Sequence, residues 1–104
     1  MTLQKVTTAE SVPPGRVVVV DVDGQAIAVC NAEGALYAIN DVCTHDGGAL
    51  DQGELDGEEI ECPRHGARFN VTTGDATQLP AFEPVETPDV RLEGETLQVG
   101  VEHR

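Results

Sequence analysis

Short apolar runs separated by glycine-bearing turns follow one another along the chain. RVVVVDV (16–22) and QAIAVCN (25–31) flank Asp23-Gly24, a dipeptide that favours a two-residue hairpin turn. ALYAIN (35–40) follows the spacer AEG, so this part of the chain predicts a three-strand meander. Shorter strand-like runs come later: EEIEC, ARFNV, DVRLE and TLQVGVE, the last two on either side of Gly94.

Helical periodicity is almost absent. The segment TTAESV (7–12) predicts at most a single turn, with Thr8 as its N-cap, before Pro13-Pro14 ends it. The pattern therefore predicts an all-β fold, a small antiparallel β-sandwich or partly open barrel. A length of 104 residues suffices for one hydrophobic core, so we expect a single domain over 1–104.

The charge balance narrows the range of partners. Nineteen acidic and six basic residues give a net charge of −13, which leaves no basic patch for nucleic acid or for an anionic membrane. The acidity either keeps the protein soluble or steers it to a basic partner. Lys5 is the only lysine, so the composition is also compatible with a general property of the host's proteins.

The chain contains no apolar stretch of signal-peptide or membrane-spanning length, which predicts a cytoplasmic protein. Three cysteines cannot all pair with one another, so we expect metal or redox chemistry rather than a disulfide framework. Cys30 alternates with Ala26 and Ala28, which indicates a buried packing residue. His103 lies in the terminal EHR and is expected to be solvated.

The remaining cysteines and histidines form two pairs, at the ends of CTHDGGALDQGELDGEEIECPRH (43–65). One residue separates Cys43 from His45, two separate Cys62 from His65, and sixteen lie between the pairs. One alternative is chance, and another is structural zinc with two Cys and two His ligands. Zinc is disfavoured because a single intervening residue strains chelation of one ion, whereas two adjacent metals could share the four ligands.

The spacing C-x-H-x16-C-x-x-H closely resembles the Rieske [2Fe–2S] signature, in which two His replace two Cys on one iron. CTHDGGAL and CPRHGARFNVTTG are similar to the two cluster loops of Rieske-type ferredoxins, and ATQLPAFEPV resembles the segment that covers the cluster. The resemblance implies one cluster in a two-loop subdomain, with loops at about 41–50 and 61–74. Its ligands would be Cys43 and Cys62 on the inner iron, and His45 and His65 on the outer iron.

Other positions acquire roles from the same resemblance. Gly47, Gly48 and Gly66 would let backbone amides approach the cluster sulfurs, because no Cβ blocks them. Pro63 would restrict the second loop, and Pro80 would belong to the covering segment. Two neutral imidazoles in place of two thiolates leave the oxidised cluster uncharged, so its potential exceeds that of an all-Cys cluster.

The resemblance also separates classes of Rieske protein. Those of respiratory complexes carry an extra cysteine in each loop and hydroxyl donors after the second histidine; this chain has Arg64, Ala67 and Phe69 at the corresponding positions. Fewer donors imply a potential toward the low end of the roughly −150 to +300 mV Rieske range. Only His103 remains for a second, mononuclear iron site. We therefore expect an electron carrier and not an enzyme.

The most specific reading is a ferredoxin, monomeric, that carries single electrons from a flavin-dependent reductase to a terminal oxygenase or similar oxidoreductase. No glycine fingerprint for nucleotide binding is present, so the reductant comes from another protein. One alternative is the small Rieske subunit of an assimilatory nitrite reductase or other multi-subunit oxidoreductase. Another is a zinc-stabilised interaction module.

Overall fold

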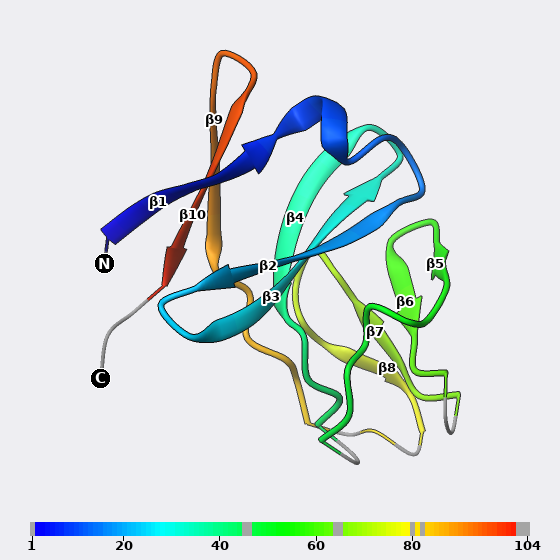
Figure 1. Cartoon of the computed structure of the whole chain (residues 1–104). Coiled ribbons are helices and arrows are strands. Elements are labelled where there is room, and N and C mark those ends of the chain that lie inside the picture. Colours follow the sequence, from blue (N-terminus) through cyan, green and yellow to red (C-terminus); the bar gives the residue numbers. More distant parts are fainter. Residues whose placement is uncertain (1, 45–46, 64–65, 80, 82, 102–104) are drawn as a thin grey trace.

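The computed structural model describes residues 2–44, 47–63, 66–79, 81 and 83–101 (Figure 1). These residues form ten strands in three antiparallel sheets, with strand orders β1-β10-β9, β2-β3-β4 and β5-β6-β7-β8. The all-β prediction is confirmed, since the helical structure among them is one short 3₁₀ turn. None of the sheets closes into a barrel within this part of the chain.

The central sheet is the predicted meander of β2 (Val17–Val22), β3 (Gln25–Ala32) and β4 (Ala35–Asn40). At the first hairpin turn Asp23 and Gly24 both have positive φ, 53° and 82°, as a type I′ turn requires. The second turn, at Glu33 and Gly34, repeats this with φ of 56° and 98°.

A second sheet joins the two ends of the chain. β1 (Thr2–Thr8) pairs with β10 (Thr96–Val101), which also pairs with β9 (Asp89–Glu93). β9 and β10 confirm the predicted closing hairpin, whereas β1 was not predicted. Its sequence, TLQKVTT, has weak apolar alternation, and its pairing partner lies at the far end of the chain.

The third sheet contains β5 (Leu55–Asp56), β6 (Glu59–Glu61), β7 (Arg68–Asn70) and β8 (Ala76–Gln78). β6 and β7 match the predicted short runs. β5 and β8 were missed because, unlike EEIEC and ARFNV, the sequences around them show no alternation of apolar and polar residues. The second expected loop, 61–74, therefore contains strand β7 as well as turns.

The predicted helical turn exists as a 3₁₀ turn, η1 (Ala9–Ser11). Thr8 is its N-cap by position, but its side chain makes no capping hydrogen bond, so that part of the prediction was wrong. The Ser11 hydroxyl donates instead to the Thr8 carbonyl, at 2.7 Å, and also bonds the Thr7 hydroxyl.

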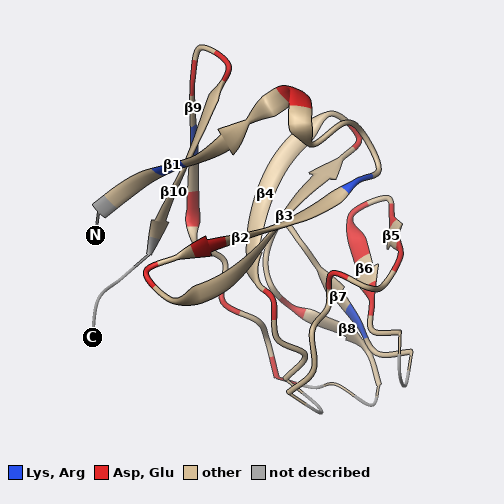
Figure 2. Ribbon diagram, in the orientation of Figure 1, with Lys and Arg blue, Asp and Glu red and all other residues tan. Residues whose placement is uncertain are grey.

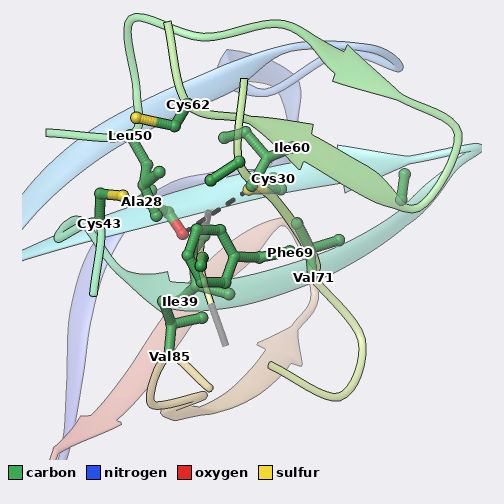
Figure 3. Packing of buried hydrophobic residues seen from close by; sticks show 13 residues of the cluster. Ala28, Cys30, Ile39, Cys43, Leu50, Ile60, Cys62, Phe69, Val71 and Val85 are labelled. Carbon is green, nitrogen blue, oxygen red and sulfur yellow. Dashed lines mark hydrogen bonds between the residues drawn. The ribbon is translucent and has the colours of Figure 1, made fainter. Parts of the chain in front are cut away.

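β3 divides the interior into two hydrophobic clusters. Its even-numbered residues Ala28, Cys30 and Ala32 lie in the cluster against β6 and β7, while Ile27 and Val29 lie in the cluster against β10. The period of two along a strand explains this division, because successive side chains point to opposite faces. Figure 3 shows the first cluster, with Cys30 packed among Ile60 and Phe69. The central sheet therefore packs against one hydrophobic cluster on each of its two faces.

Candidate metal centre

Two turns at the lower end of the molecule in Figure 1 share one pattern of backbone hydrogen bonds. In the first, the Gly47 N–H donates to the Cys43 carbonyl at 2.7 Å, and the Cys43 N–H donates to the Gly48 carbonyl at 2.7 Å. We call residues 43–48 the first ligand turn.

The second ligand turn, residues 62–67, repeats this arrangement. The Gly66 N–H donates to the Cys62 carbonyl at 3.1 Å, and the Cys62 N–H donates to the Ala67 carbonyl at 2.6 Å. Gly47 and Gly66 have φ of 76° and 75°, in the left-handed region that favours glycine. Each turn therefore has a cysteine at its base and a glycine with positive φ at its fifth position.

Cys43 and Cys62 are 0% and 1% exposed and belong to one hydrophobic cluster with Leu50 and Phe69. Figure 3 shows the two side chains on the same side of that cluster, at its boundary with the ligand turns. No disulfide joins any of the three cysteines. The turns thus bring together two residues that are far apart in sequence.

Cys30 behaves differently, as predicted. It is fully buried on β3, and burial, with a smaller contribution from the charge of Asp41, raises the pKa of its thiol to about 12. Metal ligation requires the thiolate, so Cys30 remains a protonated packing residue at neutral pH.

A covering segment, described at residues 81 and 83–86, lies against the first ligand turn. The Thr44 hydroxyl in the first ligand turn donates to the Glu83 carbonyl at 2.7 Å. The Val85 N–H donates to the Gly74 carbonyl at 2.8 Å, and a Cβ on Gly74 would lie only 2.3 Å from the Val85 carbonyl oxygen. The segment is therefore held both to a ligand turn and to the turn between β7 and β8.

The second ligand turn is supported by β7 and β8. The Gln78 amide donates to the Gly66 carbonyl at 3.1 Å. Arg68, at the start of β7, lies 3.4 to 3.5 Å from three carboxylates, those of Asp56, Glu59 and Glu61. Hydrogen bonds to Asp56 and Glu59 raise the pKa of its guanidinium, so the positive charge is permanent and locally neutralised.

Gly53 allows the chain after the first ligand turn to approach β6. A Cβ there would lie 1.7 Å from the Glu61 carbonyl oxygen, one residue before Cys62. Only glycine is compatible with this close approach. The approach brings the chain after the first ligand turn next to the chain before the second.

The predicted ligands His45 and His65 lie outside the described residues, as do Arg64, Pro80 and His103. The described residues alone contain no group of three or more His, Cys, Asp or Glu side chains placed to hold a metal ion. Cys43 and Cys62, and the backbone hydrogen bonds that close the two turns, are what the described residues contribute to the site.

The geometry of the turns does not by itself indicate a metal. Residues 70–75 repeat the same two hydrogen bonds, Gly74 N–H to the Asn70 carbonyl and Asn70 N–H to the Asp75 carbonyl, without a cysteine or histidine. What distinguishes the ligand turns is that each has a buried cysteine at its base. The thiols of Cys43 and Cys62 are soft donors that two turns place in one hydrophobic cluster. Such a pair fits the inner iron of a [2Fe–2S] centre.

Sequence reasoning missed three residues that hold the turns: Asp41, Thr44 and Gln78. Each acts through a hydrogen bond to backbone far away in sequence. A short polar side chain within two residues of a cysteine was the only signal available for Asp41 and Thr44. Pro63 lies in the second ligand turn as expected, and Ala67 and Phe69 are both fully buried.

Comparison with known proteins identifies the family. Residues 2–89 match the model of the Rieske [2Fe–2S] domain. The chain is 37% identical over 102 residues to the biphenyl 2,3-dioxygenase ferredoxin component of Rhodococcus jostii, which covers 98% of this chain and 95% of that protein. The naphthalene 1,2-dioxygenase ferredoxin component of Pseudomonas aeruginosa is 39% identical over 88 residues, 85% of each chain.

Solved structures give the same result. The ferredoxin of carbazole 1,9a-dioxygenase from Nocardioides aromaticivorans superposes with a TM-score of 0.92 at 38% identity, covering 98% of this chain and all of that one. A ferredoxin in complex with the oxygenase of carbazole 1,9a-dioxygenase has a TM-score of 0.91 at 35% identity, over 98% and 95% of the two chains. The small subunit of a nitrite reductase, at 17% identity and a TM-score of 0.81, shares the fold alone.

The described part of the chain holds no helix with the length and apolarity needed to cross a membrane. The family match spans most of the chain, and the relatives align with it over nearly their whole length. The chain therefore belongs to the Rieske [2Fe–2S] family, among the ferredoxins of oxygenase systems.

Proposed function

We propose that this protein carries single electrons from a flavin-dependent reductase to a terminal oxygenase. The observation that carries the proposal is the pairing of two equivalent turns, each with a buried cysteine at its base, in one hydrophobic cluster. A related ferredoxin, 35% identical, forms a complex with an oxygenase, which supports the choice of acceptor. The protein is an electron-transfer component and not itself an enzyme.

We further propose that the chain, as one domain over 1–104, binds a single [2Fe–2S] cluster. Cys43 and Cys62 would ligate the inner iron, and His45 and His65 the outer iron. When bound, the cluster supplies a site that accepts and releases one electron. The protein's own contribution is to hold both cysteines in register, to exclude water from their side of the cluster, and to present the histidine side to a partner.

The cytoplasm is the proposed location, since thiols stay reduced there and no disulfide joins the three cysteines. We expect a monomer with a low potential for a Rieske centre. A nitrite reductase subunit would instead co-purify with a large partner, and a zinc module would contain zinc in place of iron.

The ligand assignment is tested by comparing three cysteine variants. Cys43→Ser and Cys62→Ser should yield nearly colourless protein, with iron and acid-labile sulfide reduced to background. Cys30→Ser is the matched control, because it changes an equally buried thiol in the same cluster and should retain the colour. Loss of iron from the Cys30 variant, or its retention by the Cys43 variant, would contradict the assignment.

Electron delivery is tested with the intact protein. Protein reduced by one electron is mixed anaerobically with the oxidised terminal oxygenase of a biphenyl or carbazole dioxygenase system. Reoxidation of the ferredoxin, together with reduction of the oxygenase, should be complete within the dead time or the first seconds. A reduced protein that keeps its electron with both oxygenases would argue against this class of acceptor.

A further inference from the structure

The two ligand turns correspond position by position, and one difference between them identifies a further residue. Residues nineteen positions apart are equivalent: Cys43 with Cys62, Gly47 with Gly66, and Leu50 with Phe69. In the second turn, strands β6 and β7 continue the backbone ladder inward, through the pairs Glu61 with Arg68 and Ile60 with Phe69. The first turn is not flanked by two strands that pair with each other.

Asp41 lies two residues before Cys43, the position equivalent to that of Ile60 before Cys62. Its backbone cannot continue a ladder toward Leu50, because its N–H donates to the Ala26 carbonyl of β3 at 3.0 Å. The N–H of the preceding residue, Asn40, donates to the Glu86 carbonyl at 2.9 Å. At the end of β4, the backbone N–H groups of Asn40 and Asp41 are therefore both engaged elsewhere.

The Asp41 side chain makes the missing connection. Its Oδ1 accepts hydrogen bonds from the N–H groups of Leu50 and Asp51, both at 2.8 Å. Leu50 is fully buried in the cluster that contains Cys43 and Cys62. One carboxylate oxygen thus fixes the chain that leaves the first ligand turn to the chain that enters it.

The burial of Asp41 shows that this connection is internal to the fold. It is 7% exposed, and only Asn31 matches it among the described polar and charged side chains classed as buried. A carboxylate loses hydration when it is buried, and the hydrogen bonds from the two backbone amides offset part of that loss.

We propose that Asp41 is a positioning residue for the cluster: its carboxylate replaces the strand ladder in the first ligand turn and holds Cys43 in register with Cys62. The inference rests on the proposed function, since it concerns the cluster that the two cysteines would bind. Asp41 does not touch the cluster; it acts through Leu50 and Asp51.

The test compares Asp41→Ala and Asp41→Asn with a matched control, Asn31→Ala. Asparagine keeps the Oδ1 acceptor, whereas alanine removes it. Asn31 has the same 7% exposure and also makes two side-chain bonds to backbone, to Val12 and Gly34, both at 2.8 Å. Those bonds lie at the opposite end of β3 from Ala26, so the control reports a loss of stability without a change at the ligand turns.

The readout is the rate at which holoprotein loses its visible absorbance in excess iron chelator. Asp41→Ala should lose the cluster at least about tenfold faster than the native protein, equivalent to about 1.4 kcal/mol. Asp41→Asn and Asn31→Ala should both stay within about threefold of the native rate. The electron paramagnetic resonance signal of the reduced cluster should shift or broaden in Asp41→Ala and remain unchanged in the control.

Release from Asp41→Ala at the rate of Asn31→Ala, with an unchanged resonance signal, would overturn the proposal. If Asp41→Ala does not fold, hydrogen exchange in the native protein decides: the segment 49–53 should be protected, and immediate exchange there would refute the connection. A native protein that lacks iron and sulfide would instead refute the proposed function, so the two failures are distinguishable.

Discussion

The thiol of Cys30 lies in the same hydrophobic cluster as Cys43 and Cys62, but it is on strand β3 and not on a turn. Its pKa of about 12 exceeds the ordinary value of 9.0, so the folded state holds the proton more tightly than the unfolded state does. The resulting contribution to stability is fully present below pH 9 and is lost as the pH rises toward 12.

We therefore predict that Cys30→Ala reduces the alkaline loss of stability. Three pH units correspond to about 4 kcal/mol for a single group, at about 1.4 kcal/mol per unit. Denaturant unfolding at several pH values from 8 to 11 measures the slope, which is independent of the packing lost with the sulfur. Parallel slopes for the two proteins would show that the Cys30 thiol has the same pKa in the folded and unfolded states.

Ala67 and Phe69 set a second expectation at the residue scale. Both are fully buried beside the second ligand turn, and neither side chain can donate a hydrogen bond. The variant Ala67→Ser with Phe69→Tyr should raise the potential by tens of millivolts, since 59 mV is about 1.4 kcal/mol for one electron. Protein-film voltammetry measures the change. A positive midpoint in the native protein, or no shift in the variant, would contradict a donor-poor site.

At the scale of elements, the turn between β7 and β8 and the covering segment meet at Gly74. Gly74 has a φ of 84°, and the space where a Cβ would lie is occupied by the Val85 carbonyl. Gly15 has nearly the same φ, 83°, with no atom within 4 Å of that position. Alanine variants at Gly15 and Gly74 therefore separate the free-energy cost of backbone strain from the cost of the steric contact.

Gly15→Ala should cost about 1 to 2 kcal/mol through backbone strain alone. Gly74→Ala should cost about 1 to 3 kcal/mol more, because the covering segment must move away from the turn. Thermal unfolding measures both, with about 4 to 8 °C expected per kcal/mol for a domain of this size. Equal shifts for the two variants would show that the contact between Gly74 and Val85 is not tight.

At the scale of the whole molecule, the net charge of −13 is distributed over all three sheets (Figure 2). Segment 51–61, between the two ligand turns, contains six acidic residues and no basic one. Arg68 offsets part of this charge through Asp56, Glu59 and Glu61, while Glu54 remains exposed next to β5. The Glu54 carbonyl accepts from the Glu61 N–H, one residue before Cys62.

We predict that electron exchange with the partner slows as salt is added, and that Glu54→Lys slows it more than Glu95→Lys. Glu95 is the matched control, because it is an exposed carboxylate on the β9–β10 turn, at the other end of the molecule from the ligand turns (Figure 1). The Debye length falls from about 30 Å at 0.01 M salt to about 3 Å at 1 M, so steering is screened over this range. Stopped-flow rates that do not change with salt, or equal effects of the two variants, would show that the acidic surface does not steer the partner.

The family, the central meander and the closing hairpin followed from the sequence alone. Asp23-Gly24 and the alternation in 25–31 are local signals. They predict the structure correctly because a hairpin forms between strands that are adjacent in sequence. The spacing of the cysteines and histidines is equally local to read, since ligand types and intervals are written in the chain.

Only the tertiary structure decided how the ligand turns are held. β1 pairs with a strand at the other end of the chain, Thr44 bonds the covering segment, and Asp41 bonds the chain beyond the first turn. Each of these contacts joins residues nine or more positions apart through a polar group. No periodicity records such contacts, because a buried hydrogen bond depends on where the backbone donors lie in space and not on the residues beside it in sequence.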